Sequence, residues 1–184
     1  MKRIFDLVFV AFFSPLLVML SLITAFVVFL FIGRPILFKH DRPGLNGKVF
    51  KMYKFRTMTN ETDCAGNLLP DGDRLTKVGR VLRKLSLDEL PEFYNILKGE
   101  MSFVGPRPAL FNQENLIALR TSQGVDCLMP GLTGWAQVNG RDELPIPEKV
   151  ALDIVYMERQ SIWFDIYILW LTVLKVIHRD GITH

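Results

Sequence analysis

Two adjacent carboxylates, Asp88 and Glu89, lie within the sequence Ser-Leu-Asp-Glu-Leu-Pro-Glu at residues 86–92. Basic side chains precede them at Arg80, Arg83 and Lys84. Carboxylates beside fixed cations are suited to handling a phosphate group that carries Mg²⁺, which prefers one or two carboxylates plus phosphate oxygens. Taken alone, such an acidic pair more often marks a helix N-terminus, where the helix dipole stabilises it. A helix N-terminus and the nearby arginines would keep Asp88 ionised, which a carboxylate nucleophile requires.

Two further basic residues, Arg107 and Lys54, each have a functional and a purely structural interpretation. Arg107 lies between Pro106 and Pro108, in a stiff segment that would hold a guanidinium ready for a bidentate phosphate contact. A rigid turn with a solvent-exposed arginine is the alternative. Lys54 shares a predicted strand face with Arg56 by the two-residue period. A basic strand edge that discourages aggregation is the alternative there.

A membrane segment is predicted at the N-terminus, where Leu7 to Ile32 contains no ionisable side chain. Its 26 residues would form a helix of roughly 39 Å, enough to cross a bilayer core of about 30 Å. Both flanks are basic, so the positive-inside rule draws both ends to the cytoplasm. Ser14-Pro15 lies inside the run, where Pro15 cannot donate to the Ala11 carbonyl and the Ser14 hydroxyl could satisfy it. We therefore expect a re-entrant helix over residues 1–34, with an ordinary signal anchor as the alternative.

The elements that must position these residues, in a domain at residues 35–184, are predicted to be mainly helical with one small β-hairpin. Turn residues at 42–47 separate a short strand at 36–38 from a second at 48–58, rich in β-branched and aromatic residues. Helical spacing indicates helices at 76–85 and 109–122. Residues 59–73 are expected to form a surface loop, and residues 130–134 and 139–141 are expected to be loops around the short apolar stretch 135–138. Ser86-x-x-Glu89 resembles a capping box, and Pro91 predicts a break near Asp88.

The C-terminal region predicts a strongly apolar helix at residues 161–179 with a narrow polar stripe. Trp163, Trp170 and basic terminal residues suit an amphipathic helix in the membrane interface. A buried core helix with an exposed polar stripe is the alternative.

Composition excludes several classes of function. The net charge of +3 is too small to argue for nucleic acid and fits anionic lipid head groups or an anionic small substrate better. Cys64 and Cys127 have no C-x-x-C spacing, so neither a zinc site nor a disulfide framework is indicated. The three histidines have no metal-ligand spacing.

The combined pattern resembles the small monotopic phosphoglycosyl transferases, or bacterial sugar transferases, over essentially the whole chain. The segments that carry the resemblance are Ser14-Pro15, Arg42-Pro43-Gly44, Lys54-Phe55-Arg56-Thr57-Met58, Asp73-Arg74-Leu75, LRKLSLDELPE at 82–92, GEMSFVGPRP at 99–108 and PGLTGWAQVNGR at 130–141.

The resemblance implies transfer of a phospho-sugar from a UDP-sugar onto polyprenyl phosphate, with release of UMP, as the first membrane step of glycoconjugate assembly. It implies that Asp88 is the nucleophile, with Mg²⁺ alongside, and that Glu89 is its dyad partner. It places Arg83, Arg107 and Lys54 at phosphate-handling positions, and Gln137 and Arg141 at substrate-binding loop positions without a defined role. It identifies Ser14-Pro15 as the break in a helix within one leaflet of the bacterial inner membrane, with both termini on the cytoplasmic face. The donor sugar is not specified, although an N-acetylated amino sugar is favoured.

Two rivals remain open. A non-enzymatic, membrane-anchored scaffold would use the basic residues to hold lipid head groups. Alternatively, polyprenyl phosphate would attack the UDP-sugar directly, with Asp88 only binding Mg²⁺.

Overall fold

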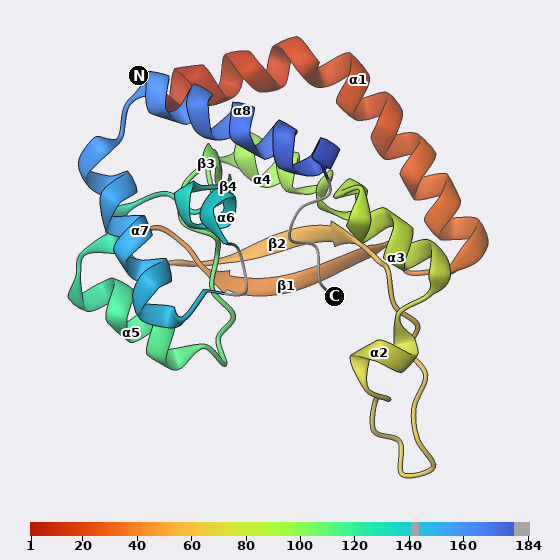
Figure 1. The fold of residues 1–184 in the computed structure, drawn as a ribbon. Coiled ribbons are helices and arrows are strands. Elements are labelled where there is room, and N and C mark those ends of the chain that lie inside the picture. The colour runs from red at the N-terminus through yellow and green to blue at the C-terminus, as the bar shows by residue number, and fades with distance from the viewer. Residues whose placement is uncertain (141–143, 179–184) are drawn as a thin grey trace. The chain divides into compact units, whose positions relative to one another are not determined.

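The structure is a computed structural model that describes residues 1–140 and 144–178 (Figure 1). The chain divides into two compact units. The larger unit comprises Met1–Val10, Asp41–Met52 and Asn95–His184, and the smaller unit comprises Ala11–His40 and Tyr53–Tyr94. The chain passes between the units within helix α1 (Lys2–Phe31), within the hairpin strands β1 (Leu37–Pro43) and β2 (Val49–Phe55), and within helix α4 (Glu92–Lys98).

Helix α1 continues through Pro15 without interruption. Pro15 removes the N–H that would bond to the Ala11 carbonyl, and the Ser14 hydroxyl donates to that carbonyl instead at 2.8 Å, as predicted. Among the described residues, α1 is the one helix long and apolar enough to cross a membrane, a test that a signal sequence would also pass. Its most apolar window is only 11% buried, which is unlike the core helix of a soluble protein.

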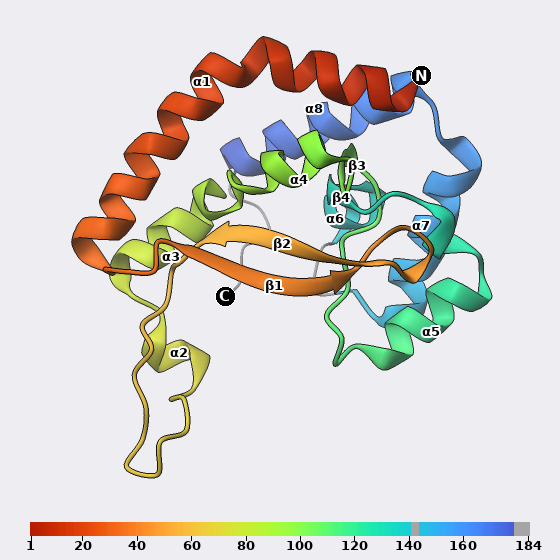
Figure 2. The same ribbon diagram turned by 180° about the vertical axis from the view of Figure 1, so that it is seen from behind.

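The predicted hairpin is confirmed as a two-stranded sheet, β1–β2, which Figure 2 shows from the opposite side to Figure 1. A short 3-10 helix, η1 (Leu45–Gly47), closes the turn, with Asn46 at φ 52° and Gly47 at φ 72°. Asn and Gly tolerate this left-handed conformation better than other residues, which explains the turn's composition. In β2 the side chains of Phe50 and Met52 are buried, in keeping with the two-residue period.

The smaller unit has its own apolar core. Its buried members come from α1, β2, α3 (Lys77–Lys84) and the segment just before α4, and they are Val28, Phe55, Leu82 and Leu90. The predicted helix at 76–85 is confirmed, and the Thr76 hydroxyl caps it by accepting from the Gly79 N–H at 2.8 Å. The short helix α2 (Asp71–Arg74) precedes it.

The larger unit contains a parallel strand pair that the sequence pattern did not predict. Strand β3 (Ser102–Val104) pairs with β4 (Gly131–Thr133) in the register Ser102 to Gly131 and Val104 to Thr133. Helix α5 (Glu114–Ser122) and the 3-10 helix η3 (Val125–Cys127) form the connection between the two strands. Strands of three residues are too short to show a hydrophobic period, so the sequence pattern does not predict them.

Helices cover this strand pair. Helix α7 (Ile146–Arg159) packs against α5, and their shared core contains Ala109, Leu116, Val125 and Val150. The predicted helix at 109–122 is shorter in the structure and begins at Glu114. The apolar stretch expected within a loop is the short helix α6 (Trp135–Asn139), which packs against α7 and α8 (Ile162–His178).

Helix α8 buries the polar side chain of Asp165 and exposes large apolar side chains. Asp165 is 1% exposed, and its carboxylate accepts hydrogen bonds from Lys2 Nζ at 2.6 Å and from the Tyr156 hydroxyl at 2.7 Å. The Thr172 hydroxyl lies 2.8 Å from that of Thr133 on β4. In contrast, Trp163 is 81% exposed and Trp170 is 60% exposed. The alternative of a buried core helix with an exposed polar stripe is therefore wrong at these positions.

Candidate active site

Asp88 and Glu89 lie in the 3-10 helix η2 (Leu87–Glu89), directly before α4, so the break predicted near Asp88 is confirmed. The predicted capping box is wrong. Ser86 has a φ of 54° and its side chain makes no capping bond, because an N-cap residue needs an extended conformation to reach the following N–H groups. The Glu89 side chain forms an ion pair with a lysine.

That lysine is Lys54, near the end of β2. Its ammonium group lies 2.7 Å from Glu89 Oε1 and 3.2 Å from Glu92 Oε1. All three side chains are largely buried, with 18%, 13% and 3% of their surface exposed in that order. Glu92 was not predicted as a site residue, although its position one helical turn after Asp88 could have suggested it.

Arg83 reaches the same region from α3. Its Nε donates to the Thr57 hydroxyl at 3.1 Å, and Thr57 lies two residues after the end of β2. Helix α3 approaches this segment closely because Gly79 has no side chain: a Cβ there would lie 2.0 Å from the Thr57 carbonyl oxygen. The residues Lys54, Arg83, Asp88, Glu89 and Glu92, all in the smaller unit, are called the Asp88 cluster from here on.

Asp88 is 8% exposed. Burial raises the pKa of the Asp88 carboxyl above its ordinary value, and the negative charge of Glu89 raises it further. Lys54 and Arg83 oppose both effects. Among the described residues no Lys or Arg forms an ion pair with Asp88 itself, so these cations act on it through space. The structure thus brings four predicted site residues into one electrostatic group.

Arg56, which was expected to share a strand face with Lys54, does not join this group. It follows the last residue of β2, and its guanidinium donates to the backbone carbonyls of Met58 and Arg34, both at 2.8 Å.

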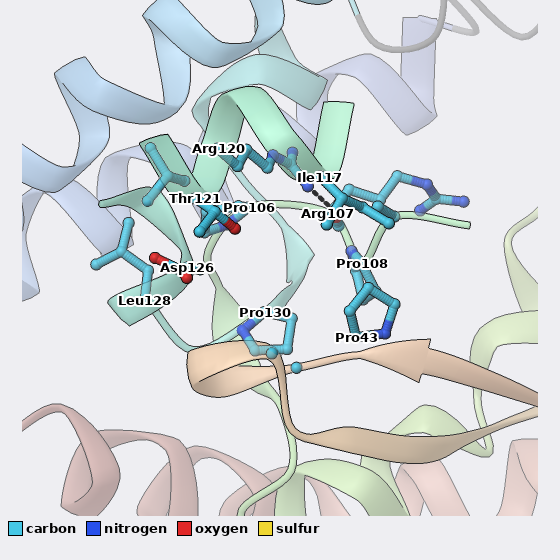
Figure 3. Close-up of a pocket in the computed structure, with 14 residues that line it drawn as sticks. Pro43, Pro106, Arg107, Pro108, Ile117, Arg120, Thr121, Asp126, Leu128 and Pro130 are labelled. Atoms are coloured by element: carbon cyan, nitrogen blue, oxygen red, sulfur yellow. Dashed lines mark hydrogen bonds between the residues drawn. The ribbon is translucent and has the colours of Figure 1, made fainter. Parts of the chain in front are cut away.

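Arg107 lies in the larger unit, half-buried between the buried residues Pro106 and Pro108. It borders a pocket lined mainly by proline, glycine and aliphatic residues, between the hairpin turn and the Pro106–Pro108 segment. Its side chain extends away from the centre of this pocket (Figure 3). Its backbone carbonyl accepts a hydrogen bond from Arg120 of α5 at 2.7 Å.

The remaining predicted residues are distributed over the chain. Gln137 lies on α6, and both polar atoms of its amide are buried without a hydrogen-bond partner among the described residues. Arg141 lies outside the described residues. Ser14 and Pro15 lie in α1. Contact of Arg107 or Gln137 with the Asp88 cluster stays a prediction, because these residues belong to the other unit.

Within residues 1–140 and 144–178, no group of three or more His, Cys, Asp or Glu side chains is arranged to hold a metal ion. A metal held by protein side chains alone is therefore not indicated for this part of the chain. One or two carboxylates, completed by phosphate oxygens of a ligand, remain compatible with Mg²⁺.

The Asp88 cluster combines a nucleophilic group with charges that bind phosphate. A buried carboxylate whose ionised form is disfavoured is a reactive nucleophile once it is ionised. Cations nearby can bind a phosphate and stabilise the charge that develops on it. The arrangement is therefore suited to phosphoryl transfer through Asp88.

Comparison with known proteins agrees with this chemistry. The family model described as "Bacterial sugar transferase" matches residues 1–179. An uncharacterized sugar transferase, EpsL, of Bacillus subtilis is 49% identical over 182 residues, which cover 99% of this chain and 90% of that protein.

Two longer relatives match only in part. The UDP-glucose:undecaprenyl-phosphate glucose-1-phosphate transferase of Escherichia coli is 43% identical over 77% of this chain and 32% of its own length. The undecaprenyl-phosphate galactose phosphotransferase of Salmonella typhimurium is 38% identical over 81% of this chain and 35% of its own length. This chain thus spans about a third of these two relatives.

Proposed function

Because the chain belongs to the bacterial sugar transferase family, we propose that it moves a phospho-sugar from a UDP-sugar onto polyprenyl phosphate through a covalent intermediate on Asp88. The observation that carries the proposal is the buried Asp88 carboxyl, which lies under the electrostatic influence of Lys54 and Arg83. Relatives named for transferring glucose 1-phosphate or galactose with undecaprenyl phosphate support the two substrate classes.

The proposed reaction has two half-reactions at one phosphorus atom. First, an ionised oxygen of Asp88 attacks the phosphorus that carries the sugar, and the bond from that phosphorus to the bridging oxygen breaks. UMP leaves with the bridging oxygen and its electron pair. Then an oxygen of polyprenyl phosphate attacks the same phosphorus, and the bond to Asp88 breaks to regenerate the carboxylate. Both nucleophiles are anions, so neither step needs a histidine base.

The other cluster residues act by position and charge. Lys54 and Arg83 bind phosphate oxygens and stabilise charge in the transition state. Glu89 holds Lys54 in place through the 2.7 Å ion pair, and its negative charge disfavours the resting Asp88 carboxylate. Arg107, Gln137 and Arg141 are also proposed to bind substrate, Arg107 through contact of its guanidinium with phosphate.

Mg²⁺ is proposed as the metal, held by Asp88 and by phosphate oxygens of the donor. The pair of adjacent carboxylates and the lack of a larger ligand group among the described residues fit this mode of binding. When bound, the ion would neutralise charge on the diphosphate and favour the ionised form of Asp88.

The membrane arrangement is also part of the proposal. Helix α1 enters and leaves the bilayer on the cytoplasmic side of the bacterial inner membrane, with Ser14-Pro15 as its break and both termini in the cytoplasm. Basic residues on both flanks and the hydroxyl bond to the Ala11 carbonyl support this topology. Labelling a terminal tag from outside intact cells would contradict it.

Helix α8 is proposed to lie in the membrane interface through its exposed apolar side chains. Trp170→Ala is expected to weaken binding of the chain to anionic vesicles by roughly tenfold, since each buried large side chain contributes about 1.5–3 kcal/mol. Vesicle flotation measures this, with Ile4→Ala as a control for general loss of apolar surface. Equal binding of native protein and Trp170→Ala would contradict the interfacial placement of α8.

The test of the proposed activity is UMP release from a panel of UDP-sugars with Mg²⁺. The panel includes glucose, galactose and N-acetylated amino sugars, because the relatives and the sequence analysis suggest different donors. Near one equivalent of UMP without lipid acceptor, and none from Asp88→Asn, is the expected result. Release that requires polyprenyl phosphate would favour direct transfer. Absence of release from every donor, with lipid present, would favour the scaffold.

A further inference from the structure

The backbone around Arg107 is fixed at three successive carbonyl groups, all within the larger unit. The Pro106 carbonyl accepts from the Gly131 N–H at 2.9 Å, and the Arg107 carbonyl accepts from Arg120 at 2.7 Å. The Pro108 carbonyl accepts from Arg42 at 3.3 Å. Prolines on both sides of Arg107 already restrict φ, so these bonds leave the segment little freedom.

The close approach of β3 and β4 holds the start of this segment. A Cβ at Gly105 would lie 2.2 Å from the Met129 carbonyl oxygen, and one at Gly131 would lie 2.1 Å from the Gly105 nitrogen. Larger residues at either position would push the segment away from β4. The fixed backbone is therefore a product of the strand pair as well as of the two arginines.

The Arg120 side chain is itself held in a defined direction. Its Nε and one terminal nitrogen lie 2.9 Å and 2.7 Å from the same oxygen, Oδ2 of Asp153 on α7. The two side chains are 11% and 2% exposed. Because the guanidinium is a rigid plane, this contact also sets the direction of the third nitrogen, which donates to the Arg107 carbonyl (Figure 3).

We propose that Arg120, oriented by Asp153, is a positioning residue that fixes the backbone of Arg107 and thereby presents the Arg107 guanidinium to the donor diphosphate. The inference rests on the proposed function for the role of Arg107. A purely structural ion pair would need only the contact between Arg120 and Asp153. The additional bond to the Arg107 carbonyl links that pair to a residue expected to bind substrate.

The test is Arg120→Lys, placed both in the native chain and in Arg107→Ala. A lysine can pair with Asp153, but its single nitrogen cannot also direct a donor to the Arg107 carbonyl. We expect kcat/KM for the UDP-sugar to fall roughly tenfold or more in the native background, since small misplacements of a binding group are costly. In Arg107→Ala the same change should cost less than about twofold, because the residue it acts through is gone.

The change in Tm separates positioning from folding. It should be the same in both backgrounds, because the Arg120–Asp153 pair does not include the Arg107 side chain. Arg159→Lys on α7 is the matched control and should leave kcat/KM unchanged. If Arg120→Lys does not fold, the pair is replaced by Arg120→Met with Asp153→Leu, since apolar replacement of a buried pair is often tolerated.

Equal losses of kcat/KM in both backgrounds would overturn the inference, as would a loss of Tm without a loss of kcat/KM. An Arg107→Ala chain with native kcat/KM would overturn it too, while leaving the role of Asp88 intact.

If no donor releases UMP, the proposed function itself fails. The same four proteins would then be compared by their Kd for UDP, and additive changes in Kd would overturn the positioning role.

Discussion

Two buried aspartates of this protein have different surroundings, Asp88 in the smaller unit and Asp153 in the larger. Burial raises the pKa of both carboxyl groups above the ordinary value. Asp153 is bound directly by Arg120, through contacts of 2.7 Å and 2.9 Å. Asp88 forms no ion pair with a described residue, and Lys54 and Arg83 act on it only through space while Glu89 repels its charge.

The difference indicates what each aspartate does. A carboxylate that is bonded to a guanidinium gives up its lone pairs to that partner and stabilises the fold. A buried carboxylate that is left without a bonded cation is costly to the fold, and it keeps its oxygens available for a substrate. Reactive groups of proteins are commonly found where burial and nearby charges shift a pKa in this way.

The largest expected effect comes from exchanging each aspartate for its neutral isostere. Asp88→Asn should lower UMP release by at least about a thousandfold, since the nucleophile is lost. Its Tm should be unchanged or higher, because a disfavoured buried charge is removed. Asp153→Asn should retain measurable activity but lose about 3–5 kcal/mol of stability, because the Arg120 charge stays buried without its partner.

UMP assays and thermal unfolding in the same detergent measure both effects. A large loss of stability in Asp88→Asn, or loss of all activity in a folded Asp153→Asn, would remove the distinction between the two aspartates.

The next largest effect is expected at Lys54, which neutralises two carboxylates of the Asp88 cluster. Lys54→Met should destabilise the fold by about 3–5 kcal/mol, because Glu89 and Glu92 lose a largely buried partner. Lys51 on the same strand is the matched control. It pairs with Asp41 at 3.2 Å, with both side chains more than half exposed, so Lys51→Met should cost no more than about 1 kcal/mol. Denaturant titration of both variants compares them, and similar losses would contradict the electrostatic account of the cluster.

A smaller effect is expected in the pH dependence of the first half-reaction. The pKa of Asp88 is raised above its ordinary value of 3.8, so single-turnover UMP release should decline with falling pH through a midpoint above that value. Arg83→Gln should move the midpoint higher, because a cation that favours the carboxylate is lost. A midpoint that Arg83→Gln leaves unchanged would exclude the through-space effect of this arginine.

The same shift has a consequence for stability with a defined sign. A raised pKa means that the folded chain binds a proton at Asp88 more readily than the unfolded chain does. The contribution of Asp88 to stability is therefore greatest below the unfolded pKa and declines as pH rises through the folded pKa. Asp88→Asn should remove this decline, which denaturant titration at mildly acidic and neutral pH measures.

Much of the fold could be predicted because its signals are local. The long apolar run predicted α1, the turn residues predicted the hairpin, and the residue pattern along the chain predicted α3 and α8. The parallel pair β3–β4 depends on contacts between residues about thirty positions apart, and its strands of three residues carry no period. The capping box was wrong because Ser86 adopts a left-handed conformation and its side chain makes no capping bond.

The residues of the site could be predicted from the sequence better than their tertiary contacts and pKa shifts. Lys54, Arg83, Asp88 and Glu89 were identified from residue type and resemblance, and the structure places them together. Glu92 could have been suggested only by its spacing from Asp88, because its role depends on a tertiary contact with Lys54. Arg120 has no motif signal, because its role depends on a tertiary contact with Asp153. The rise in the Asp88 pKa could not be predicted, because it comes mainly from burial, which depends on the tertiary fold.

The most direct test of the central claim is the intact mass of the protein after mixing with its UDP-sugar and Mg²⁺, without lipid acceptor. The account predicts a mass increase of one phospho-sugar on the native chain, its absence in Asp88→Asn, and its loss when polyprenyl phosphate is added. Full turnover with lipid, but no mass increase without it, would contradict a covalent intermediate on Asp88.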